Sequence, residues 1–371
     1  MNSTSANRPT DPPAKASVGH IQVPDRGAFT HSLSIESPLV AINYETCARI
    51  AALIASSSIP KDREEVLLRG IPPALVGNFF IFLVAICHQT SPQGKPKLEG
   101  QVGGELLIGW DYLIAKFEQR ARGDNSLLDP TRWSQLSGDQ ISAMFADDQL
   151  GNLLTRNDER AQLVQDLGVR LSKRGWLEVD KMLSFCEGRI ATGDPNLIEV
   201  LSQFHAYRDP VYKKSLFFLA LMRNSGRWQF VDNDLMAPPV DYHETRGHLR
   251  IGTVVIRDAS LLRKIRTGAM VTSDEDIAIR TAIFRAILLI SDLSGLRDSS
   301  RLHYYFWNIF RAVCLRKGPR CVAASQPPSL PQRYRVNATN GGKVFCPFES
   351  VCKSANKPDP ILEHNCLTDF Y

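Results

Sequence analysis

The chain has 371 residues, of which 43% are hydrophobic and 22% are charged, and its net charge is +5. This composition supports a large apolar core and excludes a disordered, collagen-like or coiled-coil protein. The longest apolar run, 79–87, is far shorter than the roughly 20 residues that span a bilayer. Residues 1–15 lack the apolar stretch of a secretory signal. We therefore expect a soluble intracellular protein, cytoplasmic and nucleoid-associated, or nuclear if the source is a eukaryote.

Most of the chain has the apolar spacing of helices. Before them, residues 1–35 are rich in Ser, Thr and Pro and predict a disordered tail. The expected helices span residues 43–57, 72–88, 104–121, 137–146, 158–173, 178–189, 196–205, 212–224, 241–250, 258–266, 274–293 and 300–315. Residues 72–88 are almost wholly apolar, so their helix should be central and buried on all sides. Short strands are expected only around 251–256, and the fold class is therefore mostly α.

Two segments are strongly basic, and a third is poor in helix signals. Residues 245–267 carry six Lys or Arg residues against one acid, and residues 311–335 carry six with no acid. Such a face permits contact with nucleic-acid phosphates, but a solvated basic surface explains either segment equally well. Residues 322–345 form a long stretch rich in Pro, Ser, Asn and Gly, and loops of this length are usually functional or mobile.

Five of the eight cysteines are clustered after residue 313. Cys314 and Cys321 enclose six residues, Cys346 and Cys352 enclose five, and Cys366 follows. Clustered cysteines in a chain without a secretory signal indicate a metal site rather than disulfides. The spacings are wider than the two-residue arms that zinc sites favour and suit the four thiolates of an iron–sulfur cubane. A zinc site and unligated thiols remain as alternatives, and Cys366 could replace Cys352 as a ligand.

A carboxylate precedes this cluster in the segment PPVDYHETRGHLRIG, where Asp241 stands at the start of an expected helix. Aspartate is a favourable N-cap, so a purely structural role is one interpretation. A carboxylate fixed at a helix start can also stabilise a positive charge that develops on a substrate.

These segments together resemble the helix-hairpin-helix DNA glycosylase superfamily, in its endonuclease III-like branch. The outer cysteines are similar to that family's loop C-x6-C-x2-C-x5-C, with the central spacer expanded to 24 residues. The sequences around these cysteines, RAVCLRKGPRC and CPFESVC, are also similar to those of the family. Val240-Asp241-Tyr242-His243, followed by Arg246, resembles the segment that carries the family's catalytic aspartate.

The resemblance implies a two-lobed, mostly α glycosylase fold with a C-terminal [4Fe-4S] cluster loop. A helical-barrel lobe is expected at 66–230, and a second lobe from 36–65 together with 231–371. The cluster would be held by Cys314, Cys321, Cys346 and Cys352. The expected partner is DNA with a modified or damaged base, and the expected state is a monomer.

The implied reaction is hydrolysis of the N-glycosidic bond. Asp241 would stabilise the oxocarbenium-like sugar and activate the nucleophile, which is water or Lys214. Lys214 takes the lysine position of the family hairpin, where Pro210 and Tyr212 replace both glycines. Because those glycines let backbone N–H groups approach a DNA phosphate, their loss puts ordinary duplex binding in doubt. A phosphate contact or a solvated lysine is the alternative interpretation of Lys214.

The resemblance also implies a set of residues that contact DNA or the base, each of which has a structural alternative. These residues are Gln89, Tyr242, His243, Arg246, Arg316, Lys317 and Arg320. The aromatic residues Trp110, Trp228, Phe230 and Tyr242 are candidates for base stacking and equally plausible as core residues.

Three other functions are consistent with the same residues. A related N-glycosidase could act on modified nucleosides, nucleotides or RNA, which the altered hairpin favours. The protein could instead be a non-catalytic DNA-binding iron–sulfur protein. A zinc-bearing structural protein, with Asp241 as a helix cap, is the third.

Overall fold

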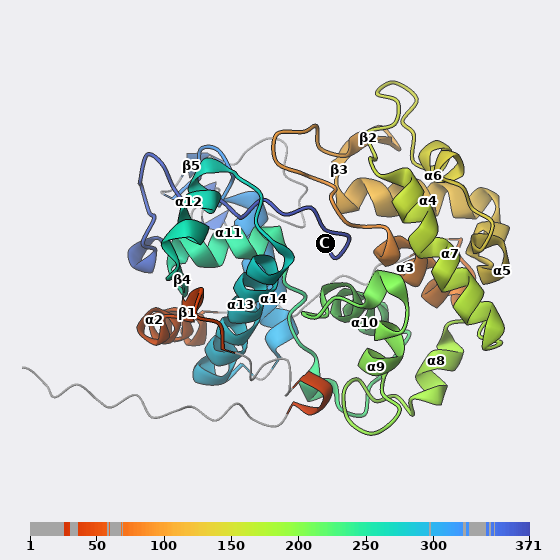
Figure 1. Ribbon diagram of the computed structural model, residues 1–371, viewed down its shortest axis with the longest axis horizontal. Helices are drawn as coiled ribbons and strands as arrows, with labels where there is room; N and C mark the ends of the chain where they lie inside the picture. The colour runs from red at the N-terminus through yellow and green to blue at the C-terminus, as the bar shows by residue number, and fades with distance from the viewer. Residues whose placement is uncertain are drawn as a thin grey trace, which may run out of the picture.

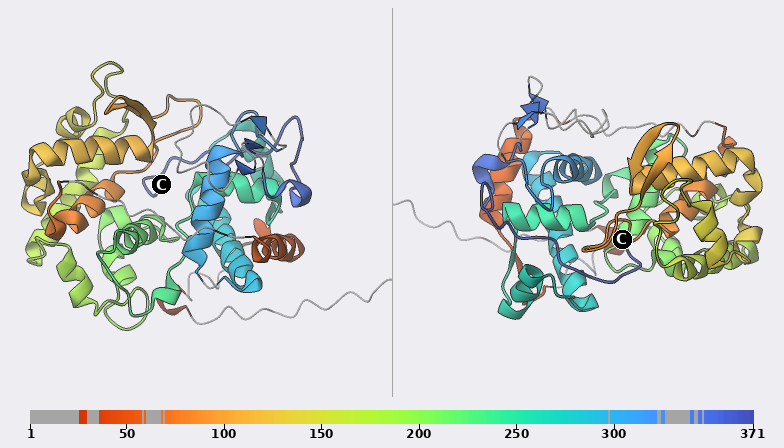
Figure 2. Two further views of the ribbon diagram at one scale, coloured as in Figure 1. Left: turned by 180° about the vertical axis from the view of Figure 1, so that it is seen from behind. Right: turned by 90° about the horizontal axis from the view of Figure 1, so that it is seen from above.

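The computed structural model describes residues 26–29, 36–57, 59, 68, 70–296, 298–321, 324–325, 339–340, 343–344 and 346–371. Helices dominate this part of the chain, which confirms the mostly α prediction. They form two lobes that lie side by side, with Tyr371 between them (Figure 1; Figure 2). Within the described ranges no helix is both long and apolar enough to cross a membrane. Residues 1–25 of the predicted tail lie outside the described residues.

The first lobe follows the chain from residue 70 to the end of α10. Its elements are η2 (Pro73–Leu75), α3 (Val76–Ala85), β2 (Glu99–Val102), β3 (Glu105–Ile108), α4 (Trp110–Gly123), η3 (Asn125–Leu128), α5 (Pro130–Trp133), α6 (Gly138–Met144), α7 (Asn157–Lys173), α8 (Asp180–Phe185), α9 (Leu197–Ser202), η4 (His205–Tyr207) and α10 (Lys213–Asn224). Helix α3 lies against α4, α7 and α10.

Helix α3 is the centre of the first lobe, and all ten of its residues are buried, as predicted. Its one polar side chain, Asn78, donates to the carbonyl oxygens of Leu128 and Leu177 and accepts the N–H of Val179. A buried amide is stable only when its hydrogen bonds are made. Asn78 therefore ties two loops to the central helix.

The second lobe combines the N-terminal described residues with those after α10. Its elements are η1 (Gly27–Phe29), β1 (Val40–Ile42), α2 (Tyr44–Ala55), η5 (Asn233–Leu235), α11 (Tyr242–Ile251), β4 (Val254–Ile256), α12 (Ala259–Thr267), α13 (Ser273–Ser294), α14 (Ser299–Ala312), β5 (Ala324–Ser325), β6 (Thr339–Asn340), β7 (Lys343–Val344) and η6 (Glu349–Val351). Strands β1 and β4 pair antiparallel, with Val40 opposite Ile256. Strand β7 lies between β5 and β6.

Two sequence predictions need correction. The helix expected at 104–121 begins only at Trp110, because 99–108 form the antiparallel hairpin of β2 and β3. Gly103 and Gly104 both have positive φ, which suits the tight turn of a hairpin and not a helix. Phe29, within the predicted tail, is fully buried and packs against the rings of Tyr212 and Phe284.

A buried ion cluster joins the two lobes. Arg280 of α13 forms two hydrogen bonds, of 2.8 and 2.9 Å, with the carboxylate of Asp209, which precedes α10. Arg280 also binds Asp276, one turn earlier on α13, at 2.9 Å. All three side chains are almost fully buried. Burial opposes the charge on Asp276, but the Arg280 guanidinium prevails and lowers the pKa of that carboxyl.

Replacing Arg280 with methionine should destabilise the protein strongly. The R280M variant leaves two buried carboxylates without their cation, so the free energy of unfolding should fall by about 3–5 kcal/mol. The matched control is R170M, which removes an arginine paired with Asp166 at 2.6 Å but 41% exposed. That exposed pair should contribute about 0.5 kcal/mol or less. Denaturant unfolding measures both, and equal losses would contradict the role given to Arg280.

Candidate active site and cysteine pocket

Asp241 lies at the start of α11, where it caps the helix. Its Oδ1 atom accepts the N–H of His243 at 2.7 Å, and its own N–H donates to Glu244 Oε2 at 3.1 Å. Trp307 of α14 donates its indole N–H to Oδ2 at 3.0 Å. Because donors engage both oxygens at a helix N-terminus, the carboxylate has a fixed orientation and its negative charge is stabilised.

Close packing of α11 on α14 brings Trp307 to Asp241. A Cβ atom at Gly247 would lie 2.3 Å from ring atoms of Phe310, so only glycine allows this approach. Phe310 and Trp307 are three residues apart on α14 and therefore project from the same side of that helix.

Glu244 is a second carboxyl group at this site, next to Asp241. Its side chain is fully buried and contacts Nδ1 of His303. Burial, followed by the charge of Asp241, raises the pKa of the Glu244 carboxyl well above its ordinary value. The Glu244 carboxyl is thus held neutral, and Asp241 lies half-buried beside it.

Arg246 connects the start of α11 to the loop after α14. Its Nε donates to the carbonyl oxygen of Cys314 at 2.7 Å, and its Nη1 pairs with Glu363 Oε2 at 3.1 Å. Its Nη2 lies 2.9 Å from Nδ1 of His243 and donates to the carbonyl oxygen of Phe310 at 3.1 Å. Arg246 is 2% exposed, so its donors serve the protein interior rather than a DNA phosphate.

His243 lies between the rings of Tyr242 and Trp307, with centroids 4.2 and 5.8 Å away. Burial, followed by the charge of Arg246, lowers the pKa of His243 well below its ordinary value. A neutral His243 therefore accepts a hydrogen bond from Arg246, which fixes the imidazole in place.

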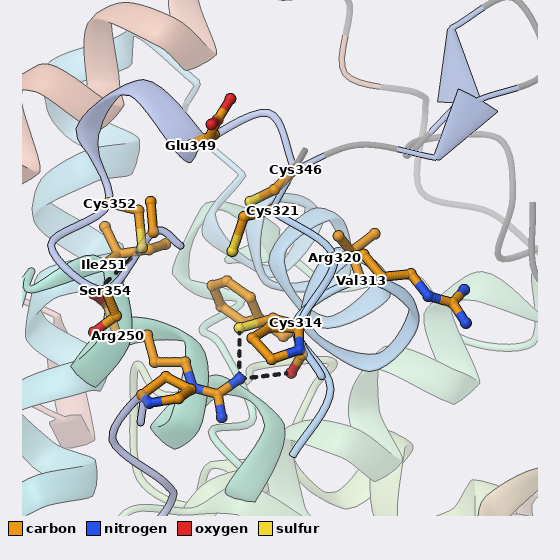
Figure 3. A pocket seen from close by; sticks show the side chains of 14 residues that line it. Arg250, Ile251, Val313, Cys314, Arg320, Cys321, Cys346, Glu349, Cys352 and Ser354 are labelled. Atoms are coloured by element: carbon orange, nitrogen blue, oxygen red, sulfur yellow. Dashed lines mark hydrogen bonds between the residues drawn. The ribbon is translucent and has the colours of Figure 1, made fainter. Parts of the chain in front are cut away.

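Cys314, Cys321, Cys346 and Cys352 line one pocket behind α11 (Figure 3). Burial raises the pKa of Cys346 to about 12, and the other three thiols act on it in the same direction. Within the described residues, no group of three or more Cys, His, Asp or Glu side chains is arranged to hold a metal ion. The four cysteines thus line one pocket, but their side chains are not arranged in a metal-coordination geometry.

Arg250 faces these cysteines from α11, one turn after Arg246. Its Nη1 atom lies 3.3 Å from both the sulfur and the carbonyl oxygen of Cys314 (Figure 3). The same atom donates to the carbonyl oxygen of Leu315 at 2.7 Å. The side chain is 1% exposed.

Cys366 lies elsewhere, in a second pocket between the lobes. The pocket is lined by Gln89 and residues 91–93 of the first lobe, by Tyr242 and Arg316 of the second, and by residues 363–366 and Tyr371. Gln89 donates from Nε2 to the carbonyl oxygen of Cys366 at 3.1 Å. The guanidinium of Arg316 lies 5.4 Å from the ring centroid of Tyr242 and binds Glu363. Three of the residues predicted to contact DNA or the base therefore meet here.

Lys214 points into the first lobe. It is fully buried, and its Nζ donates to the carbonyl oxygen of Ala85 at 2.6 Å and lies 3.5 Å from Nδ1 of His88. Lys213 is also buried, with Nζ 3.5 Å from the sulfur of Cys87. Neither amine is presented on an open surface.

The remaining predicted residues have different surroundings. Lys317 is exposed, and Arg320 lies at the edge of the cysteine pocket with its guanidinium turned away from the sulfurs (Figure 3). Trp228 is a core residue whose indole N–H donates to Asp180 at 2.7 Å. Trp110 and Phe230 are half-buried, and Trp110 packs edge-on against Phe217.

Sequence reasoning missed Trp307, Arg250 and Glu363. The spacing of Arg246 and Arg250, four residues apart, is a signal that both project from one face of α11. Trp307 and Glu363 have no such local signal, because their partners are 66 and 117 residues away.

Comparison with models of known protein families gives no match, and no curated protein is significantly similar to this sequence.

The burial of Lys214 predicts a pH dependence of stability. Burial lowers the pKa of this amine from 10.5 to about 8. Between these pH values the unfolded chain keeps a proton that the folded protein releases, so the free energy of unfolding rises with pH. Relative to K214M, the native protein should gain up to ~3 kcal/mol between pH 8 and pH 10.5. Denaturant unfolding at successive pH values measures this difference.

K181M is the control, because Lys181 is exposed. Its stability relative to the native protein should not vary over the same range. A flat difference for K214M as well would show that Lys214 is solvated rather than buried.

Proposed function

We propose that this protein is an N-glycosidase of the DNA glycosylase type, which releases a modified or damaged base from a deoxynucleotide. The observation that carries the proposal is the construction of α11. The helix has a fixed, half-buried carboxylate at its N-terminus and a four-cysteine pocket behind it, in the order that the sequence resemblance implies.

Asp241 has the environment that this chemistry requires. Breaking an N-glycosidic bond develops positive charge on the sugar, and a fixed carboxylate opposite that charge stabilises the transition state. The same carboxylate can accept a proton from an attacking water molecule. The donors from His243 and Trp307 hold Asp241 in one orientation, so little reorganisation is needed during the reaction.

Water, rather than Lys214, is the nucleophile in this proposal. An amine must be accessible to attack the sugar carbon and form a Schiff base. Lys214 is fully buried and bound to the carbonyl oxygen of Ala85. The proposed enzyme therefore excises the base without cutting the nucleic-acid backbone.

The four pocket cysteines fit a [4Fe-4S] cluster. Four thiolate donors are the usual ligand set of such a cluster, and Arg250 offers an N–H to the sulfur of Cys314. A bound cluster would supply a rigid, charged centre behind α11. Arg246 and Arg250 both bind the Cys314 carbonyl oxygen and so hold this loop against the helix that carries Asp241.

Substitution of Asp241 separates a catalytic role from a capping role. Asparagine keeps the N-cap oxygen but cannot accept from Trp307, so D241N should lose that one hydrogen bond, whereas D241A should also lose the cap, which contributes about 1 kcal/mol. Both variants should lose base release by about 100-fold or more, because neither has a carboxylate. The assay is chromatography of free base released from a panel of modified bases, in oligonucleotides and as deoxynucleoside 5′-monophosphates. Native base release by D241N would refute catalysis by Asp241.

Substitution of the cysteines tests the cofactor. C314S should lose iron, sulfide and the broad visible absorption of an iron–sulfur protein purified anaerobically. C366S is the matched control and should keep all three, because Cys366 lies in the other pocket. Zinc in place of iron in the native protein, or equal losses in both variants, would contradict this assignment.

A further inference from the structure

An ion pair between the lobes lies close to Asp241. Arg311 of α14, in the second lobe, binds the carboxylate of Asp111, in the first turn of α4 of the first lobe. Arg311 also donates to the carbonyl oxygen of Ile108 at 3.5 Å. The side chains of Asp111 and Arg311 are 4% and 16% exposed, so the pair lies largely out of water, where opposite charges attract more strongly. The first lobe therefore fixes a guanidinium that belongs to the second.

The same guanidinium holds the indole ring of Trp307. Trp307 and Arg311 are four residues apart on α14, so their side chains lie on one face of that helix. The central carbon of the guanidinium lies 4.8 Å from the centroid of the Trp307 ring, which is the geometry of a cation–π contact. The ring also packs edge-on against His243, with centroids 5.8 Å apart. These two contacts together restrict rotation of the indole.

The indole in turn directs one oxygen of Asp241. Its N–H donates to Oδ2 at 3.0 Å, whereas Oδ1 accepts the backbone N–H of His243 at 2.7 Å. The start of α11 thus engages Oδ1, and Trp307 engages Oδ2. A carboxylate that stabilises a developing positive charge must present its oxygens in a fixed direction. The position of the Trp307 ring therefore matters for the role proposed for Asp241.

The charge of Arg311 also acts on the start of α11. Burial, followed by the charges of Arg246 and Arg311, lowers the pKa of His243. Burial and the charge of Asp241 raise the pKa of Tyr242, and Arg311 opposes that rise. Arg311 therefore lies close to both of the residues that follow Asp241, in agreement with its contact to Trp307.

We infer that Asp111 of the first lobe is a positioning residue for Asp241. It fixes the guanidinium of Arg311, which holds the ring of Trp307, and the indole N–H then holds Oδ2 of the carboxylate. This inference rests on the proposed N-glycosidase function and adds a form of regulation to it. A displacement of the lobes that separates Asp111 from Arg311 releases the indole, so base release requires the two lobes to be in contact at this point.

Another ion pair across the lobes provides a matched control. Arg223 of α10, in the first lobe, pairs at 3.4 Å with Asp298, the N-cap residue of α14 in the second lobe. Trp307 lies nine residues further along α14, roughly 13 Å away at 1.5 Å per residue. The R223Q variant therefore weakens a contact between the lobes without removing a contact of Trp307 or Asp241.

Steady-state kinetics of base release test the role of Asp111. The substrate is the member of the modified-base panel that the native protein cleaves fastest. D111N should lower kcat about tenfold and leave KM nearly unchanged, because Asp111 acts on the carboxylate and not on the substrate. W307F should lose at least as much, and D111N/W307F should lose no more than W307F alone, because Asp111 acts through the indole. R223Q should keep the native kcat.

Two kinetic results would overturn the inference. These are additive losses in D111N/W307F and a loss in R223Q equal to that in D111N. Because D111N leaves the Arg311 cation without its partner, the double variant D111N/R311M is a second test. It removes both charges, so it should fold and should show the same loss of kcat.

Tryptophan NMR tests the positioning without a substrate. The protein has five Trp residues, and W307F identifies the indole N–H signal of Trp307. In D111N this N–H should exchange with solvent about tenfold faster than in the native protein or R223Q, because the ring is no longer held against Asp241. Unchanged exchange in D111N would overturn the inference. Faster exchange in D111N, with no base released by the native protein from any substrate, would support the positioning and refute the proposed N-glycosidase function.

Discussion

The guanidinium of Arg280 is the interaction on which the arrangement of the lobes depends. It lies between Asp209 of the first lobe and Asp276 of the second, and all three groups are removed from water. Each carboxylate has a further task. Asp209 binds backbone amides of the hairpin 209–213 before α10, and Asp276 binds His364 and Tyr371 of the C-terminal segment 361–371. Because a buried charge is tolerated only with its partners in place, the hairpin, the segment and the two lobes are held together as one unit.

Helix α11 links the two chemically interesting parts of the molecule. Asp241 stands at its N-terminus, and Arg246 and Arg250 reach from its side to the backbone of Cys314. Gly247 lets the helix approach α14 closely enough for Trp307 to bind the Asp241 carboxylate. A displacement of the loop at Cys314 would therefore move α11 and, with it, the carboxylate of Asp241.

The sequence predicted the local features well. The apolar run in α3 indicated a buried central helix, and the segment D-Y-H-E indicated a capped start for α11. Both are properties of residues within one or two helical turns of each other. The hairpin at 99–108 was missed because the two glycines at 103–104 were not recognised as a turn.

The sequence by itself determined that the chain is mostly helical, where most helices begin and which cysteines have the spacing of a cluster loop. Only the tertiary structure decided which polar side chains remain accessible to a ligand or substrate. Lys214 and Arg246 are buried in the folded protein, and Cys366 lies in a different pocket from the other four clustered cysteines. Residues 361–371 lie between the lobes. The physical reason is that helix formation and capping depend on neighbours a few residues away, whereas burial and hydrogen-bond satisfaction depend on partners that are distant in sequence.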